Sequence, residues 1–542
     1  MKHTIKLLLL FVSSILLVNC KKITDNVGFS VNGDVIKYGV SFQFWDPKTS
    51  NGMAPQNIFV RITGKDASKV YEYGGTKVFN VSSTGILSLG IDPFVKPSSS
   101  APIAFTVEVY APDYATIKIP ITVDGNQKQQ LINVTMVNLK NPPNGVSVKQ
   151  TQVQLAADGS VASTVTLATT PNATTPEIST LTIPVGTKFK DANGSIINNN
   201  GGSLQVSQVF YSTRTSSSLS AFPQNSFLSD SIYTEGGNRI SGYFQTSGFT
   251  SIEMTLNGQE VKFFTNPITV SVGIDPSYIN PTTKAAVKSG DNIPIFSYDV
   301  TKNRWNFEKN VTISSNYTAE FTTSHLTYYS PAWPGVQCSS SVSMTFNTHV
   351  STVSTYLMDI YAKDGDPRQP IVAGILISAT NGQSVSVSDV PTGNVVIKVY
   401  PNNANNSQSD WAIRDAAPLG VYDGDACSAA SININMPNAQ NFPSVTFNIV
   451  GRCPGNVLIY PTVPTYYRKA GTNSPYTLLG TVVLGQFTTT NLQLNSSYDF
   501  LWLWKNRELV RPNKLIDSLS YTRVLNVNER FPGDTLQDLF CY

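Results

Sequence analysis

The chain has 542 residues, of which 13% are charged and 41% are hydrophobic. Lys and Arg total 38 against 35 Asp and Glu, and no basic run stands out, which excludes nucleic acid as a partner. The charged fraction is about half the usual value near 25%, so Ser, Thr and Asn supply most of the polarity. A chain of this length builds several hydrophobic cores, and we expect about three or four domains.

The N-terminus has the features of an export signal. Lys2 and Lys6 supply positive charge, and residues 7–18 form an unbroken run of apolar and small side chains. This run is too short to cross a membrane as a helix, which needs about 20 residues. No other apolar run approaches that length, so we expect any membrane attachment to be made at this end of the chain.

The apolar run ends in a Leu-Val-Asn-Cys sequence closed by Cys20 and followed by two lysines. This segment resembles a lipobox, in which the cysteine is acylated and becomes the new N-terminus. The resemblance implies a lipoprotein signal peptide over residues 1–19, a lipid on Cys20 that binds the membrane, and a tether over residues 20–27. A plain secretory signal and an uncleaved N-terminal anchor are the alternatives.

Short runs rich in Val, Ile, Thr and Phe follow, with almost no helical periodicity between them. Turn pairs such as Asp-Gly and Asn-Gly separate them. Short strands at this spacing predict an all-β chain of tandem sandwich-like domains. The clearest predicted strands are residues 58–63, 104–110, 117–123, 131–137, 179–184, 268–272, 395–400 and 445–450.

Residues 28–143 are expected to form the first module. A strand begins near Val31, and the segment 111–116 (Ala-Pro-Asp-Tyr-Ala-Thr) precedes two further strands and an Asn-Pro-Pro end. This order resembles the carboxypeptidase-regulatory-like or CnaB-type sandwich, with Asp113 where Gly is usual. The resemblance implies an Ig-like spacer or binding domain without catalytic residues of its own, as in multidomain surface lipoproteins of Gram-negative bacteria.

Residues 145–335 are predicted to form a larger β-domain, and two smaller sandwiches are predicted over residues 336–437 and 438–542. The smaller pair follows from cysteine spacing, because Cys338 and Cys427 lie 89 positions apart, and Cys453 and Cys541 lie 88 apart. Nearly equal intervals laid end to end predict the disulfides Cys338–Cys427 and Cys453–Cys541, each closing one module in an oxidising compartment. Free or differently paired thiols are the alternative.

The segment 500–504 (Phe-Leu-Trp-Leu-Trp) alternates aromatic residues with leucine. Side chains alternate between the two faces of a strand, so Trp502 and Trp504 share one face and the leucines the other. If the leucine face is core, the tryptophans could form a ligand-binding platform for sugar rings. A strand buried on both faces is the alternative.

Candidate chemistry is sparse. Two histidines, His325 and His349, follow the signal segment, and we expect His325 to be structural. No familiar nucleophile, phosphate-loop or metalloprotease motif is present in the sequence. Two Asp-Gly-Asp turns, at residues 364–366 and 423–425, could offer oxygen ligands to calcium but are also ordinary turn sequences. The sequence therefore predicts no enzyme, no cofactor and no bound metal.

These features predict a non-enzymatic lipoprotein of the cell envelope, anchored in the outer membrane and presenting β-modules for adhesion or for binding a protein or glycan ligand. A structural fimbria-like subunit and an accessory protein of polysaccharide capture, or a divergent enzyme, are the alternatives. With the lipid at the N-terminus, we expect the modules to extend from the membrane in chain order, with residues 438–542 furthest out.

Overall fold

The computed structural model describes the backbone of residues 30–32, 36–49, 53–72, 75–125, 129–199, 201–223, 226–351, 353–402, 417–429, 431–439, 443–454, 457–504, 507–526, 530–531 and 534–535. Strands dominate these residues, and the helices among them are short, as in α2 (Ser216–Leu219) and the 3-10 helix η3 (Ala67–Lys69). The predicted all-β fold is confirmed. No helix in the described ranges combines the length and the apolar character needed to cross a membrane.

The first module is a sandwich of the sheets β4-β5-β2-β8 and β3-β6-β7. Residues that point alternately inward and outward along the strands form its core. In β6, for example, Phe105 and Val107 are buried, whereas Ala104 and Thr106 are half-exposed. In the turn before β7, Asp113 adopts a φ of 66°, the left-handed conformation in which Asp can replace Gly. The strands are β2 (Gly39–Trp45), β3 (Phe59–Thr63), β4 (Val70–Glu72), β5 (Ile86–Ile91), β6 (Ile103–Tyr110), β7 (Ile117–Val123) and β8 (Gln129–Thr135).

The second module stacks a nine-stranded sheet on a five-stranded sheet. Its strands carry two cores, one around Leu181 and Ile268 and one around Phe222 and Trp305. The strands are β9 (Val146–Gln154), β10 (Val165–Ala168), β11 (Ser179–Ile183), β12 (Phe189–Lys190), β13 (Ser203–Tyr211), β14 (Leu228–Tyr233), β15 (Arg239–Thr246), β16 (Phe249–Leu256), β17 (Gln259–Glu260), β18 (Phe263–Gly273), β19 (Ile279–Asn280), β20 (Ala285–Ala286), β21 (Asn292–Asp299), β22 (Arg304–Thr312), β23 (Thr318–His325) and β24 (Tyr328–Val336).

The third module is a sandwich of the sheets β27-β26-β29-β30 and β28-β25-β31. The predicted bridge Cys338–Cys427 is present and joins the start of the module to its last turns. The strands are β25 (Val342–Asn347), β26 (Ser354–Ala362), β27 (Val372–Ala379), β28 (Gln383–Val387), β29 (Asn394–Pro401), β30 (Gly420–Asp425) and β31 (Ile432–Asn435).

The fourth module pairs the sheet β35-β34-β37-β38 with a sheet built on β32. Cys453 is disulfide-bonded, but Cys541 lies outside the described residues, so the pairing of these two cysteines stays a prediction. The strands are β32 (Val445–Cys453), β33 (Val457–Tyr460), β34 (Val463–Lys469), β35 (Thr477–Val482), β36 (Gln486–Thr489), β37 (Ser496–Trp504), β38 (Arg507–Ile516) and β39 (Ser520–Asn526), followed by the hairpin β40 (Arg530–Phe531) and β41 (Asp534–Thr535).

The first described strand, β1 (Ser30–Asn32), does not join the first module to which the sequence assigns it. It pairs in parallel with β33, with Ser30 opposite Leu458 and Asn32 opposite Tyr460. The sheets of the first module begin only at β2. The N-terminal strand therefore extends a sheet of the fourth module, more than 400 positions along the chain.

The first and fourth modules also pack face to face. Ile86 on β5 lies in one buried cluster with Tyr466, Leu501 and Leu503 of β34 and β37. The backbone N–H of Thr84 donates to the Oε1 of Glu508 at 3.1 Å. An apolar side chain and a backbone N–H of the first module thus meet an aromatic and leucine face and a carboxylate of the fourth.

At the centre of this contact, Ser41 and Ser88 lie directly opposite each other on β2 and β5, with 3.4 Å between their hydroxyl oxygens. The fully buried phenol of Tyr466 reaches them from β34. Burial raises the pKa of Tyr466, and the nearby hydroxyls of the two serines oppose that rise. The contact is therefore a buried internal interface, in which the phenol oxygen of Tyr466 lies without a hydrogen-bond partner of its own among the described residues.

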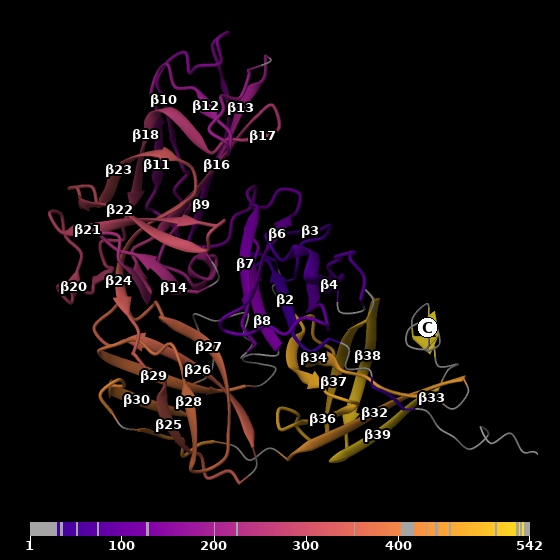
Figure 1. Cartoon of the computed structure of the whole chain (residues 1–542). Coiled ribbons are helices and arrows are strands. Elements are labelled where there is room, and N and C mark those ends of the chain that lie inside the picture. The colour runs from indigo at the N-terminus through magenta and orange to yellow at the C-terminus, as the bar shows by residue number, and fades with distance from the viewer. Residues whose placement is uncertain are drawn as a thin grey trace, which may run out of the picture.

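This arrangement corrects the expected order of the modules. Figure 1 shows the fourth module beside the first, and the strands β10, β12 and β17 of the second module at the opposite end of the molecule. The prediction that residues 438–542 lie furthest from the N-terminal end of the chain is wrong, because β1 is part of that module's sheet. The chain folds back so that its last module meets its first.

An ionic joint connects the second and third modules. The buried carboxylate of Asp275 accepts from Arg368 at 2.6 Å and lies 2.8 Å from the guanidinium of Arg214. Burial alone would raise the pKa of Asp275, but the hydrogen bonds from Arg368 and Ser277 outweigh it and lower the pKa. Breaking such a buried pair leaves an uncompensated charge, so the joint resists separation of the modules.

We expect Tyr466→Ala to open the contact between the first and fourth modules. The change removes a fully buried aromatic side chain and should lower the free energy of unfolding by roughly 3 kcal/mol or more. Hydrogen exchange should then accelerate in β2 and β5 as well as in β34. Leu519→Ala, at a half-exposed position of the same module, should change stability by less than about 0.5 kcal/mol. Unchanged exchange in β2 and β5 would contradict the interface.

Peptide mapping without reduction should recover Cys338 linked to Cys427 and Cys453 linked to Cys541. Replacing Cys338 and Cys427 together by serine should cost up to about 4–5 kcal/mol, because the bridge closes a long loop. Hydrogen exchange in β25–β31 would report this loss. A crossed pairing would refute the model of two separately closed modules.

Candidate functional site

The strand β37 is buried on both faces. Phe500 is in the core of the fourth sandwich, and Trp502 packs against the same cluster with its ring stacked on Phe500 at 6.1 Å. The Nε1 of Trp502 donates to the hydroxyl of Thr465 at 2.9 Å. The leucines of the strand form the contact with the first module. These contacts place Trp502 with the core residues, and the side chain of Trp504 lies outside the described residues.

His325 lies at the end of β23 in a small polar group. Its Nδ1 is 3.2 Å from the hydroxyl of Thr323, and its Nε2 is 3.6 Å from the carboxylate of Glu308. This resembles the order of a nucleophile, a base and an orienting acid. However, Thr323 is buried and its oxygen lies 2.8 Å from the hydroxyl of Tyr329, which leaves a substrate no approach. The group therefore ties β22, β23 and β24 together.

The two Asp-Gly-Asp turns use their carboxylates within the protein. Asp366 accepts from Arg368, and Asp364 pairs with Lys284 of the second module at 2.6 Å. Asp425 accepts from the backbone N–H of Cys427, and hydrogen bonds at this turn, chiefly from Ser428, lower its pKa. Among the described residues no three His, Cys, Asp or Glu side chains cluster as a metal site would require.

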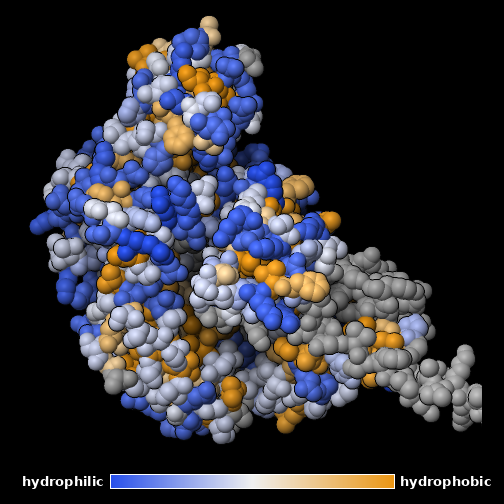
Figure 2. All heavy atoms as spheres, in the orientation of Figure 1, coloured by the Kyte–Doolittle hydropathy of each residue, from blue (hydrophilic) through white to orange (hydrophobic). Residues whose placement is uncertain are grey.

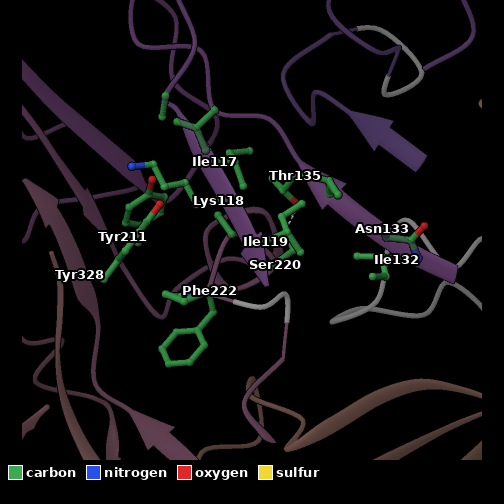
Figure 3. Close-up of a pocket in the computed structure, with 15 residues that line it drawn as sticks. Ile117, Lys118, Ile119, Ile132, Asn133, Thr135, Tyr211, Ser220, Phe222 and Tyr328 are labelled. Carbon is green, nitrogen blue, oxygen red and sulfur yellow. Dashed lines mark hydrogen bonds between the residues drawn. The ribbon is translucent and has the colours of Figure 1, made fainter. Parts of the chain in front are cut away.

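A cavity lies between the first and second modules. It measures about 40 Å³ and is lined by β7 and β8 on one side and by residues around α2 on the other. Figure 3 shows Ile119 and Phe222 lining this space, and the Thr135 hydroxyl donates to Ser220 across it at 2.7 Å. A space of this size holds a few water molecules, so we assign it to the joint between the modules.

The same joint contains a charged network. Lys118 on β7 reaches Glu260 on β17 at 3.3 Å, and Lys262 pairs with the same carboxylate at 2.6 Å. Glu253 on β16 faces these three groups. Burial raises the pKa of Glu253 to about 7, and the nearby Lys118 only partly offsets this rise. Burial raises the pKa of two nearby tyrosines, Tyr211 and Tyr328, and the charge of the Glu253 carboxylate adds to the rise in both.

The residues of both joints of the first module could not be identified from the sequence. Ser41, Lys118 and Glu260 have side chains that an isolated strand would turn to solvent. The sequence signal was the mostly apolar run Ile86–Ile91, which forms β5 and is buried at all six positions. An unbroken run of this kind indicates a strand covered on both faces, although it does not identify the covering module.

The raised pKa of Glu253 predicts pH-dependent stability. Its carboxylate is neutral more readily in the folded state than in the unfolded chain, where the pKa is about 4.3. The contribution to stability is therefore complete below about pH 4.3, and it declines as the pH rises to about 7. We expect the free energy of unfolding to fall by about 1–3 kcal/mol across this range.

Urea unfolding at several pH values measures this effect, and Glu253→Gln should flatten the profile between pH 4.5 and 7. Glu320→Gln, at an exposed position of β23, serves as the control and should retain the slope. An identical slope in the Glu253→Gln variant would show that other groups cause it.

Comparison with known proteins identifies no family. No family model and no curated protein matches the sequence. Similar solved structures include the major pilin subunit of Bacillus cereus, which is 8% identical, with a TM-score of 0.14, over 74% of this chain and 99% of the pilin.

Two further solved structures have similarly low sequence identity and TM-score. The Bacillus anthracis TIE protein is 8% identical, with a TM-score of 0.12, over 71% of this chain and 58% of that protein. A streptococcal ancillary pilin is 10% identical, with a TM-score of 0.13, over 46% of this chain and 96% of the pilin. Values this low assign neither a family nor a function to the chain.

Proposed function

We propose that this chain is a non-enzymatic lipoprotein of the bacterial cell envelope that presents its β-modules for adhesion or ligand binding. The observation that carries the proposal is the placement of β1 in the sheet of the fourth module. It puts the first described strand, which follows the predicted lipobox in the chain, against a body of packed modules. Such a body holds its outer surfaces in fixed positions relative to the membrane.

The predicted anchor lies close to this body. Ser30 follows Cys20 by ten positions, and ten fully extended residues reach at most about 35 Å. A lipid on Cys20 would therefore hold β1 and the neighbouring first and fourth modules near the membrane. The second module would project furthest from it (Figure 1).

The joints between modules support a binding scaffold. Buried ion pairs join the second module to the third, and hydrogen bonds join the first to the second and to the fourth. Fixed modules reduce the conformational freedom that a ligand must remove on binding, which favours affinity. Figure 2 shows a largely hydrophilic face with small, separate apolar spots, which suits recognition of polar partners.

The alternative of a fimbria-like subunit requires strands to be exchanged between copies. In this chain β1 already occupies the edge of β33 in its own fourth module. An assembling subunit would first have to release that strand. We therefore favour the monomeric scaffold, and polymerisation of the purified mature chain would favour the fimbria-like alternative.

Cys20→Ala should abolish labelling by a fatty-acid analogue and move the protein from the membrane fraction to the soluble fraction. Cys338→Ala, which removes a cysteine from a disulfide in the third module, should leave the labelling intact.

Any polysaccharide that the wild-type chain retains should keep its chain length during incubation, as measured by size-exclusion chromatography. Labelling of the Cys20→Ala variant would refute the anchor, and release of oligosaccharides would refute the non-enzymatic assignment.

A further inference from the structure

The outer face of the sheet β3-β6-β7 is the part of the first module that its neighbours leave largely open. The opposite sheet is covered by the fourth module through Ile86, and β7 meets the second module through Lys118. Away from that contact, alternate residues of β3 and β6 project outward and are paired across the strands. Phe59 lies opposite Tyr110, and Arg61 lies opposite Glu108.

Phe59 supplies an exposed aromatic ring within a strand. It is 65% exposed, whereas its neighbour Val60 packs against the core of the module. The half-buried Tyr110 beside it adds a second ring and a hydroxyl group. Aromatic rings offer large, rigid contact area, and Tyr combines it with a polar tip.

Arg61 is held in place next to these rings. Its Nε donates to the Oε2 of Glu108 at 2.7 Å, a second guanidinium nitrogen also contacts that oxygen, and the Tyr110 hydroxyl donates to it at 3.0 Å. The guanidinium carbon lies 5.8 Å from the centre of the Tyr110 ring. The hydrogen bond to Glu108 raises the pKa of Arg61. The guanidinium is thus oriented before any ligand arrives.

The burial of the partners decides which ligand this surface fits. The Arg61 side chain is 65% exposed and that of Glu108 only 11% exposed, so donors face solvent while the balancing charge lies beneath them. The pair is neutral as a whole, which removes the long-range attraction that an anionic ligand would exploit. A neutral ligand with an apolar ring face and many hydroxyl groups matches two rings beside fixed donors.

We propose that Phe59, Tyr110 and Arg61 form a binding platform for a neutral polysaccharide. This inference rests on the proposed function as a ligand-binding envelope protein and names its ligand class. The C–H face of a sugar ring packs on Phe59, and ring hydroxyls accept from the guanidinium of Arg61. Tyr and Arg are among the residue types that contribute most binding energy once a ligand covers them and excludes water.

The test uses the complete mature chain with Cys20→Ala, so that no lipid is attached. Affinity electrophoresis against laminarin, dextran and xylan, with polygalacturonate as the acidic probe, should show retention by at least one neutral polysaccharide. Phe59→Ala should weaken that retention at least tenfold, and Arg61→Lys, which keeps the charge but loses the fork of donors, should weaken it severalfold. Phe94→Ala is the matched control, because Phe94 is 95% exposed at the turn after β5 and should leave retention unchanged.

The melting temperature of each variant shows whether the fold survives. If Phe59→Ala unfolds the module, the Arg61→Lys variant decides the question. Retention by no neutral polysaccharide, or equal loss in Phe94→Ala, overturns the platform. Retention that survives both Phe59→Ala and Arg61→Lys also overturns it but leaves the proposed binding function standing, because another surface then holds the ligand.

Discussion

The rest of the structure depends on the face-to-face packing of the first and fourth modules. Strand β37 is a central strand of the fourth sandwich, and its outer leucine face is covered by β2 and β5 of the first. Apolar surface that this contact removes from water stabilises the folded chain by about 25 cal/mol per Å². The hydroxyl groups of Ser41 and Ser88 pair with each other within the contact, beside the buried phenol of Tyr466. A chain that would otherwise be a string of modules is thereby closed on itself.

The local part of this fold could be predicted from the sequence, and the long-range part could not. Period-two alternation and turn residues predicted the β-fold, and equal cysteine spacing predicted the bridge Cys338–Cys427, because both signals are local or involve one pair. Ser41 and Gln43 alternate with buried Val40 and Phe42, a pattern typical of a solvated face. Both are buried, and Ser41 lies beside Tyr466 of a module that follows more than 400 residues later. The alternation of polar and apolar residues shows which face of a strand is the more apolar. It does not show whether another module covers the polar face.

The aromatic residues illustrate the same limit at the level of the candidate site. Trp502 is a residue type suited to a ligand-binding platform, yet its ring packs beside Phe500 and its Nε1 donates to Thr465. Phe59 stands in an ordinary apolar run, Ile58 to Val60, and is the residue of that run that faces solvent. Burial depends on the position of a strand in its sheet and on the neighbouring module, and neither is encoded in the residue type. Exposed aromatic residues therefore become recognisable only once the register of β3 against β6 is known.

The position of β1 determines which parts of the molecule carry load. If Cys20 carries the proposed lipid and the first module the proposed ligand, a force between them would pass along the chain through β1 into β2, without crossing the second or third module. Because β1 also pairs with β33, part of that force would be transferred to the fourth module and its contact with β5. The ionic joint at Asp275 and the network at Glu253 lie outside this path. They can set the orientation of the second and third modules without bearing such tension, so the groups most sensitive to pH are separated from the segment that would hold the molecule to the membrane under the proposed function.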